Sequence, residues 1–278
     1  MSWWAIDVRT AEEQRSFIGA WLVARTGQAV EERDDGTLVT FAPDEGAAEA
    51  LIAELGREVD ASARAERRVL EPVDWSTRWR EGLGARQFGR LTVLPSWIAE
   101  ASNPGACAVV LDPETAFGSG EHGSTRVALT LLEHLLQPGS TVLDLGTGSG
   151  ILAIAAVQLG AARAIGIEID DEAIEVAERN AARNGVADRI DFLVGDAAVL
   201  APLVGPADLL LSNILRTVNT ALLPAIASAL IHGGLAIFSG MEHTEAPEFT
   251  RALLNERFTP VLEREDAEWW GIAARRSK

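Results

Sequence analysis

Apolar and polar positions along the first 71 residues repeat with the periods of short strands and helices. Residues 4–8 alternate as in a half-buried strand, and residues 11–26 carry a helical apolar stripe that stops at Gly27. Thr10-Ala11-Glu12-Glu13 has the form of a capping box, which predicts Thr10 as the N-cap of that helix. The predicted order is the ferredoxin-like one, with strands at 4–8, 29–32, 38–41 and 68–71, and a second helix from Asp44 to Gly56.

From residue 106 the pattern becomes strand, loop and helix in repetition, which predicts a parallel sheet covered by helices on both faces. Strands are expected at 108–111, 141–145, 164–169, 189–194, 208–212, 235–239, 258–264 and 269–274, and helices at 124–136, 151–158 and 172–183. The last two strands are expected to form an antiparallel pair. Residues 72–104 are rich in Trp and Gly and are predicted to be a linker between a 1–71 and a 105–278 domain, with a short strand at 90–94.

Composition narrows the cellular setting. Cys107 is the single cysteine, so no internal disulfide forms. Apolar runs are too short for a membrane helix and the N-terminus lacks a secretory signal, so we expect a cytoplasmic protein without membrane contact. The net charge of −17 disfavours direct nucleic-acid binding and suits a basic protein partner, although solubility alone explains it equally well. The eight tryptophans are interpreted as core and interdomain packing.

The run Asp144-Leu145-Gly146-Thr147-Gly148-Ser149-Gly150 stands at the end of a predicted buried strand. Glycines there let a ligand approach the backbone, and the N–H groups at the start of the next helix favour a polar or anionic group. A dinucleotide site or a plain tight turn fits such a loop as well. The dinucleotide fingerprint is G-x-G-x-x-G, however, and here the third glycine comes one residue early, a spacing typical of methyltransferases.

Three polar residues follow at the ends of successive strands. Glu168 can accept hydrogen bonds from both hydroxyls of a ribose. Asp196 can meet an adenine amino group, or can cap a helix, as Asp170 is expected to do. Asn213 can orient an amine whose lone pair attacks a methyl group, or can simply form a turn. Their convergence at one sheet edge predicts an adenosine site with a catalytic asparagine.

Together with Asp112–Thr125, which contains Phe-Gly-x-Gly-x-His, and with Asn213-Ile214-Leu215, these motifs resemble the PrmA family over the whole chain. Members of that family trimethylate the large-subunit ribosomal protein eleven. The resemblance implies a seven-stranded Rossmann-like class I methyltransferase domain of the α/β class, with a small N-terminal ferredoxin-like α+β domain that recognises the substrate protein. It also implies S-adenosylmethionine as cofactor and no metal; a monomer is expected.

Carried over by position, the resemblance assigns cofactor contacts to Phe117, Gly118, Thr125, Gly146, Gly148 and Glu168, with Asn213 between cofactor and amine. The position of Asp196 at a strand end adds it to the predicted cofactor contacts. Glu168 stands where Asp is usual. Arg216 stands where a small residue is common, and its charge could repel a lysine at the amine's entrance. His122 could act as a base, because histidine side chains in general change protonation near neutrality. The neighbouring glycines favour a structural role in a tight loop.

Three alternatives remain open at this point. The same chemistry could act on another protein, such as the β-subunit of electron-transfer flavoprotein, whose lysine methyltransferases share the Phe-Gly-x-Gly-x-His block. The chain could also bind S-adenosylmethionine without catalysis, as an assembly factor. An NAD-dependent oxidoreductase is disfavoured by the glycine spacing and by the absence of any tyrosine for a Tyr–Lys proton donor. The leading hypothesis is N-methylation of lysine or α-amino groups on a ribosomal protein.

Overall fold

The computed structural model describes residues 3–28, 30–33, 35–59, 62–69, 84–100, 105, 107–112 and 120–277. The contacts of the chain divide it into two compact units, Met1–Glu81 and Gly82–Lys278. None of the helices in the described ranges is long and apolar enough to cross a membrane. The predicted division of the chain at residues 71 and 104 stays a prediction. The described part of the expected linker holds two short strands, Arg86–Phe88 and Leu91–Leu94, and a short helix, Ser96–Ala99.

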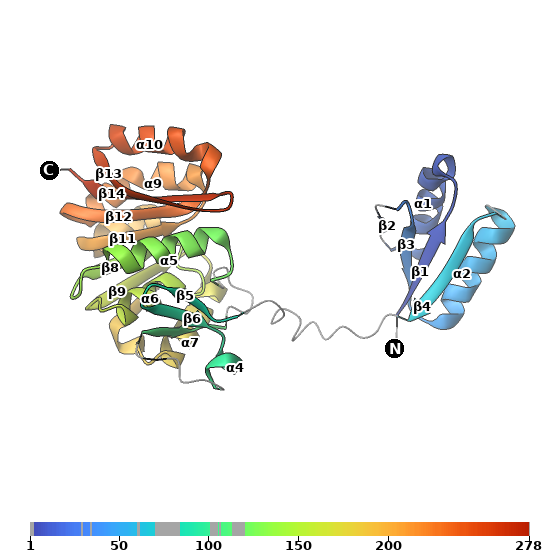
Figure 1. Ribbon diagram of the computed structural model, residues 1–278, viewed down its shortest axis with the longest axis horizontal. Coiled ribbons are helices and arrows are strands. Elements are labelled where there is room, and N and C mark those ends of the chain that lie inside the picture. Colours follow the sequence, from blue (N-terminus) through green and yellow to red (C-terminus); the bar gives the residue numbers. More distant parts are fainter. Residues whose placement is uncertain are drawn as a thin grey trace. The chain divides into compact units, whose positions relative to one another are not determined.

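The first unit is a four-stranded antiparallel sheet with two helices, in the order β2-β3-β1-β4 (Figure 1). Its elements are β1 (Trp4–Arg9), α1 (Glu12–Thr26), β2 (Glu31–Glu32), β3 (Leu38–Ala42), α2 (Glu45–Glu58) and β4 (Arg64–Val69). Strand β1 in the middle buries Ile6 and Val8 against Ile18 and Leu22 of α1. The ferredoxin-like arrangement expected for this unit is confirmed.

Local details of this unit depart from expectation in three places. The N-cap of helix α1 is Ala11, so the prediction of Thr10 as the N-cap is wrong. Helix α2 continues past Gly56 to Glu58, although Asp44 caps it as predicted by accepting from the Ala47 N–H at 2.8 Å. Strand β4 begins at Arg64 rather than residue 68, since its pairing with β1 extends to Arg9.

The second unit is built on a seven-stranded sheet in the order β10-β9-β8-β11-β12-β14-β13 (Figure 1). All neighbouring pairs from β10 to β12 are parallel, and β14 is antiparallel to both β12 and β13. The sheet elements are β8 (Thr141–Leu145), β9 (Arg163–Glu168), β10 (Ile190–Val194), β11 (Ala207–Asn213), β12 (Leu230–Glu242), β13 (Phe258–Asp266) and β14 (Trp269–Arg276). This is the predicted α/β architecture, including the antiparallel closing pair.

Helices cover both faces of this sheet because its strands bury alternate residues on opposite sides. Leu209 and Leu211 of β11 face one core cluster, and Leu210 between them faces the other. Residues of α5 to α7 contribute to the first cluster and residues of α8 to α10 to the second. The helices are α5 (Gly123–Leu135), α6 (Ile151–Gln158), α7 (Asp171–Arg183), α8 (Ala197–Val204), α9 (Arg216–Ala229) and α10 (Ala246–Asn255), with 3-10 turns at Ala187–Arg189 and His243–Glu245.

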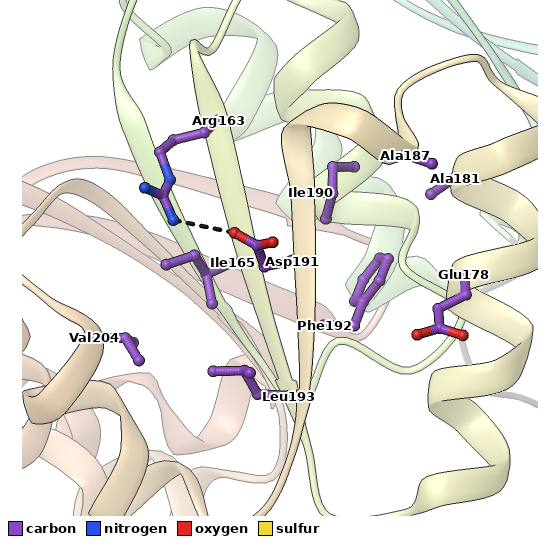
Figure 2. A pocket seen from close by; sticks show the side chains of 10 residues that line it. All are labelled: Arg163, Ile165, Glu178, Ala181, Ala187, Ile190, Asp191, Phe192, Leu193 and Val204. Carbon is purple, nitrogen blue, oxygen red and sulfur yellow. Dashed lines mark hydrogen bonds and ion pairs between the residues drawn. The ribbon is translucent and has the colours of Figure 1, made fainter.

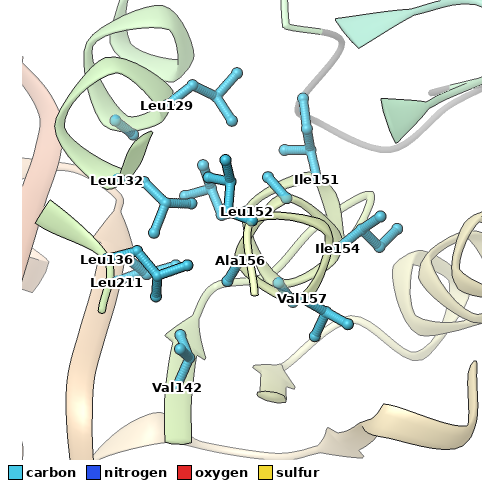
Figure 3. Close-up of a cluster of buried hydrophobic side chains, with 14 of the residues drawn as sticks. Leu129, Leu132, Leu136, Val142, Ile151, Leu152, Ile154, Ala156, Val157 and Leu211 are labelled. Atoms are coloured by element: carbon cyan, nitrogen blue, oxygen red, sulfur yellow. The ribbon is translucent and has the colours of Figure 1, made fainter. Parts of the chain in front are cut away.

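Helix α6, which follows the glycine loop, is apolar on every side and almost wholly buried. Figure 3 shows its side chains, among them Leu152 and Ala156, enclosed by Leu132 of α5, Val142 of β8 and other core residues. A helix that is hydrophobic all round is stable only when it is covered on all sides. This packing fixes the N-terminus of α6, which directly follows the glycine loop.

A separate three-stranded sheet was not predicted. It has the order β5-β6-β7, from β5 (Arg86–Phe88), β6 (Leu91–Leu94) and β7 (Ala108–Val110), with helix α4 (Ser96–Ala99) between the last two strands. Leu91 and Val109 of this sheet belong to the same core cluster as α5 and α6. Strand β7, expected in the main sheet, therefore pairs with residues of the expected linker instead.

Candidate active site

The glycine loop connects β8 to α6 and passes directly beside the end of β11. Gly146 has φ +65, and a Cβ at this position would lie 2.7 Å from Cγ2 of Ile214. Both the torsion and the lack of space therefore require glycine here. The next glycine, Gly148, donates its N–H to Oε2 of Glu168 at 3.1 Å. The loop is thus fixed from the β11 side and from the β9 side.

Glu168 is held by backbone donors on both of its oxygens. Oε2 accepts from Gly148, and Oε1 accepts from the N–H groups of Ile169 at 2.8 Å and Asp170 at 3.3 Å. These bonds orient the carboxylate at the carboxyl end of β9, and Oε2, which accepts from a single donor, keeps a lone pair for a further one. Asp170 caps α7 as predicted, by accepting from the Glu172 N–H at 3.0 Å.

Asp144 lies beneath the loop and is 1% exposed. Its Oδ2 accepts from the Thr147 hydroxyl at 2.6 Å and from the Ala153 N–H at 3.1 Å, whereas Oδ1 has no hydrogen-bond partner among the described residues. Burial raises the pKa of Asp144 from 3.8 to about 7, and the nearby Glu168 charge acts in the same direction. The first acid of the motif therefore sits in the core under the site.

Asp196 caps a helix at the edge of a small hollow. Its Oδ1 accepts from the Ala198 N–H at 2.8 Å and so caps α8. The residue also lines a small hollow of about 200 Å³, whose other walls include Gly146, Glu168 and Gly195. The cap is confirmed, and the adenine contact stays a prediction that this placement permits.

Asn213 ends β11 with its carboxamide held from two sides. Its Nδ2 donates to the Thr125 hydroxyl of α5 at 3.2 Å, and its Oδ1 accepts from the Ser239 hydroxyl of β12 at 3.0 Å. Thr125 is fully buried and does not line the cavity described next, so it contacts Asn213 from behind. Ser239 was not identified from the sequence, since its strand neighbours give no sign of this contact.

A cavity of about 490 Å³ opens between the glycine loop and the end of β11. It shares Gly146, Glu168, Ile214 and Val218 with the hollow beside Asp196, so the two adjoin. Its wall combines polar groups from Glu168 and Asn213 with apolar side chains from Ile214, Leu215 and Val218. The lining residues are His122, Ser124, Gly146, Gly148, Glu168, Asn213, Ile214, Leu215, Val218, Gly240 and Trp269.

His122 and Trp269 form an aromatic pair on that wall. Their ring centroids are 4.3 Å apart, and His122 Nδ1 shares a hydrogen bond of 2.8 Å with the Ser124 hydroxyl. These contacts agree with the structural role favoured for His122. Trp269, by contrast, was expected among the packing tryptophans. Its neighbour Trp270 does lie in the core at 1% exposure, but Trp269 faces the cavity.

Arg216 does not present its charge to the cavity. The guanidinium binds Glu245 at 3.0 Å and Glu248 at 2.8 Å, and its side chain is 20% exposed. The residue is absent from the cavity lining. The carboxylates therefore neutralise and hold away the cation that could have repelled a lysine.

Phe117 and Gly118 lie outside the described residues. The other predicted site residues meet at one edge of the sheet: Gly146, Gly148, Glu168 and Asn213 line the cavity, Asp196 the adjoining hollow, and Thr125 supports Asn213. In the described ranges no cluster of three or more His, Cys, Asp or Glu side chains could hold a metal ion.

A further hollow, of about 730 Å³, lies at the exposed edge of the sheet along β10 (Figure 2). It shares no lining residue with the cavity beside the glycine loop. Figure 2 shows that its basic side chain, Arg163, is bound to Asp191, at 3.1 Å. Its remaining walls are apolar apart from Glu178, and no acid–base or nucleophilic group converges there.

The family model of ribosomal protein L11 methyltransferase (PrmA) matches residues 5–277. The chain belongs to the PrmA family. Similar proteins include the ribosomal protein L11 methyltransferase of Enterobacter sp. (strain 638), 43% identical over 211 residues that cover 74% of this chain and 69% of the relative. That of Pelotomaculum thermopropionicum is 39% identical over 229 residues, which cover 82% of this chain and 74% of the relative.

Among solved structures, a ribosomal protein L11 methylase from Lactobacillus delbrueckii subsp. bulgaricus superposes with a TM-score of 0.63 at 34% identity. The match covers 70% of this chain and all of that one. Membership of the PrmA family confirms the predicted class of methyltransferase, its S-adenosylmethionine cofactor and the seven-stranded fold. It supports the leading hypothesis rather than the flavoprotein alternative or the oxidoreductase.

Proposed function

We propose that this PrmA-family protein transfers methyl groups from S-adenosylmethionine to amino groups of ribosomal protein L11, on lysine side chains and the α-amine. The proposal is carried by one observation: the Asn213 carboxamide, fixed by Thr125 and Ser239, lies on the wall of the cavity beside the glycine loop. The names of the relatives supply the substrate protein.

The groups that line the two adjoining hollows fit the chemistry of S-adenosylmethionine. Glu168 would accept from the ribose hydroxyls, Asp196 would meet the adenine side, and Gly146 and Gly148 would let the cofactor approach the backbone of the loop. Phe117, Gly118 and Thr125 stay predicted contacts. When bound, S-adenosylmethionine supplies an electrophilic methyl group on a sulfonium.

The side chains of this protein would position the amine. Asn213 Oδ1 accepts one hydrogen bond from Ser239, and its second lone pair is available to an amine N–H. This bond would direct the nitrogen lone pair, and such orientation contributes much of the rate of a two-substrate reaction. Leu215, Val218 and Trp269 offer an apolar wall to the aliphatic part of a lysine and keep water away. The amine reaches this position after losing its proton to solvent.

The proposal also covers setting and partners. The acidic chain would act in the cytoplasm as a monomer on a basic protein, without direct contact to nucleic acid or membrane. Its net charge of −17 supports a basic partner, since opposite charges attract at long range.

The test incubates purified protein with methyl-labelled S-adenosylmethionine and ribosomal protein L11, and locates the label by mass spectrometry. We expect label on amines of L11 with the natural chain and at least about a hundredfold lower kcat with Asn213→Ala, because orientation is lost. Asn255→Ala, at an exposed position in α10, is the matched control and should keep full activity. Label only on another protein would refute the substrate, and undiminished activity of Asn213→Ala would refute the assigned role.

A further inference from the structure

A fully buried carboxamide lies directly behind the Asn213–Leu215 segment. It belongs to Asn219, in the first turns of α9, which is 0% exposed and lines neither of the two adjoining hollows. Asparagine has a low helix propensity and costs free energy when buried, unless all its polar atoms are bonded. A fully buried helix position is ordinarily occupied by an apolar side chain. The hydrogen bonds of the Asn219 carboxamide therefore need an explanation.

Those hydrogen bonds join the end of β11 to the neighbouring strand β12. Asn219 Oδ1 accepts from the Ser212 hydroxyl at 2.6 Å. Its Nδ2 donates to the carbonyl of Ile214 at 2.9 Å and to the carbonyl of Ser239 at 3.1 Å. Both amide hydrogens are used, so the carboxamide can take only one orientation. The Asn219 carboxamide thereby holds Ser212 and Ile214, the residues just before and just after Asn213.

The same network reaches Asn213 itself through Ser239. The backbone carbonyl of Ser239 is held by Asn219, and its hydroxyl donates to Asn213 Oδ1 at 3.0 Å. The adjacent Gly240 has φ +82, and a Cβ there would stand 2.5 Å from the carbonyl oxygen of Ile214. The Ile214 peptide thus lies tightly against β12, and Asn219 binds the groups on both sides of this close approach.

We propose that Asn219 is a positioning residue for methyl transfer, which fixes the Ile214 and Ser239 carbonyls so that Asn213 presents its carboxamide to the amine in one orientation. This inference rests on the proposed function of Asn213. Fully bonded buried polar networks specify one geometry, whereas an apolar contact at this place would tolerate several. The role is indirect, because Asn219 lies behind the cavity wall.

The test is a double-mutant cycle of Asn219→Ala and Asn213→Ala, with kcat for L11 methylation and the dissociation constant of S-adenosylmethionine as readouts. We expect Asn219→Ala to lower kcat about tenfold to a hundredfold, since misplacement of about 1 Å has effects of that order. Cofactor affinity should change little, because Asn219 has no bond to the glycine loop. Asn219→Ala should have no further effect in the Asn213→Ala background. If the losses of kcat of the two single variants multiply in the double variant, Asn219 has a merely structural role and the inference is overturned.

Two further variants keep the test decisive. Ser239→Ala removes only the hydroxyl that reaches Asn213, so it should lower kcat even if Asn219→Ala proves too unstable to purify. Asn184→Ala is the matched control, because that carboxamide also makes three hydrogen bonds and lines neither hollow. It accepts from the N–H of Val110 at 2.7 Å, and it donates to the Val110 carbonyl at 2.7 Å and to the Asn180 carbonyl at 2.8 Å. This variant should lose stability but keep kcat; an equal loss of kcat would count against Asn219.

A crystal structure of Asn219→Ala separates this inference from the proposed function. If the natural chain fails to methylate L11, the proposed function fails, yet the orientation of Asn213 can still be read. A carboxamide that has left Thr125 supports the positioning role. A carboxamide that keeps its natural orientation overturns it, whatever the activity.

Discussion

Asp144, the first acid of the glycine motif, makes the stability of the folded protein depend on pH. Its carboxyl group is buried with one oxygen unpaired, and its pKa is raised to about 7. Between the unfolded value of 3.8 and this value, the folded protein binds more protons at this group than the unfolded chain does. The contribution of Asp144 to stability is therefore greatest at low pH and is lost as the pH rises toward 7.

We expect Asp144→Asn to remove this pH dependence, because an amide of the same shape does not ionise. Between about pH 4 and about pH 7 the natural chain should lose on the order of 4 kcal/mol from this group, and the variant should not. The measurement is urea denaturation of both proteins across that range, and the quantity compared is the difference in unfolding free energy. Parallel curves for the two proteins would contradict the raised pKa.

At the scale of elements, the β13–β14 hairpin is fastened to α5 beside the cavity. Arg126 of α5 binds Asp266 through two hydrogen bonds, of 2.5 and 2.9 Å, and also donates to the Glu121 carbonyl. The hydrogen bonds and charge of Arg126 hold the pKa of Asp266 below 3.8. Trp269 follows three residues later and meets His122, so this ion pair supports the aromatic wall.

We expect Asp266→Asn to lower the unfolding free energy by about 1 kcal/mol or less at neutral pH, since both partners are partly exposed and solvent screens them. Because the pKa of Asp266 is depressed, its stabilisation is present above 3.8 and disappears as the pH falls through the lower folded value. Thermal denaturation of variant and natural chain should therefore differ at pH 7 and converge in strong acid. Asp191→Asn, in the exposed pair with Arg163, serves as control, and an effect as large there would weaken the argument.

Elements with strong periodic patterns could be predicted from the sequence, and their long-range partners could not. The uninterrupted apolar run of Leu209, Leu210 and Leu211 predicts a strand covered on both faces, which the two core clusters confirm. Nothing in the short apolar run of β7 distinguishes the three-stranded sheet from the main one, because pairing depends on residues that are distant in the chain. For the same reason Glu168 and Asn213 could be identified from motifs, whereas Ser239 and Trp269 could not.

At the scale of the molecule, both units are acidic. Met1–Glu81 has 10 basic and 17 acidic residues, a net charge of −7, and Gly82–Lys278 has 14 and 24, a net charge of −10. A basic substrate would thus be attracted by each unit. Because salt screens such attraction, we expect kcat/KM for L11 to fall about tenfold between ~10 mM and ~200 mM salt while kcat stays nearly constant. Steady-state kinetics over this range, with a neutral osmolyte as control, provide the measurement; a kcat/KM that does not respond to salt would exclude steering.

The neighbouring Trp269 and Trp270 of β14 point to opposite faces of the sheet, one to the cavity and the other to the core. The sequence contains no tyrosine, so the near-ultraviolet emission of the protein comes from its eight indoles. Trp270 should report unfolding through a red shift of its emission. The emission of Trp269 should change when a ligand displaces water from its ring, and Trp269→Phe should abolish that change. This protein therefore carries an intrinsic optical probe of occupancy, which allows binding to be titrated without any label.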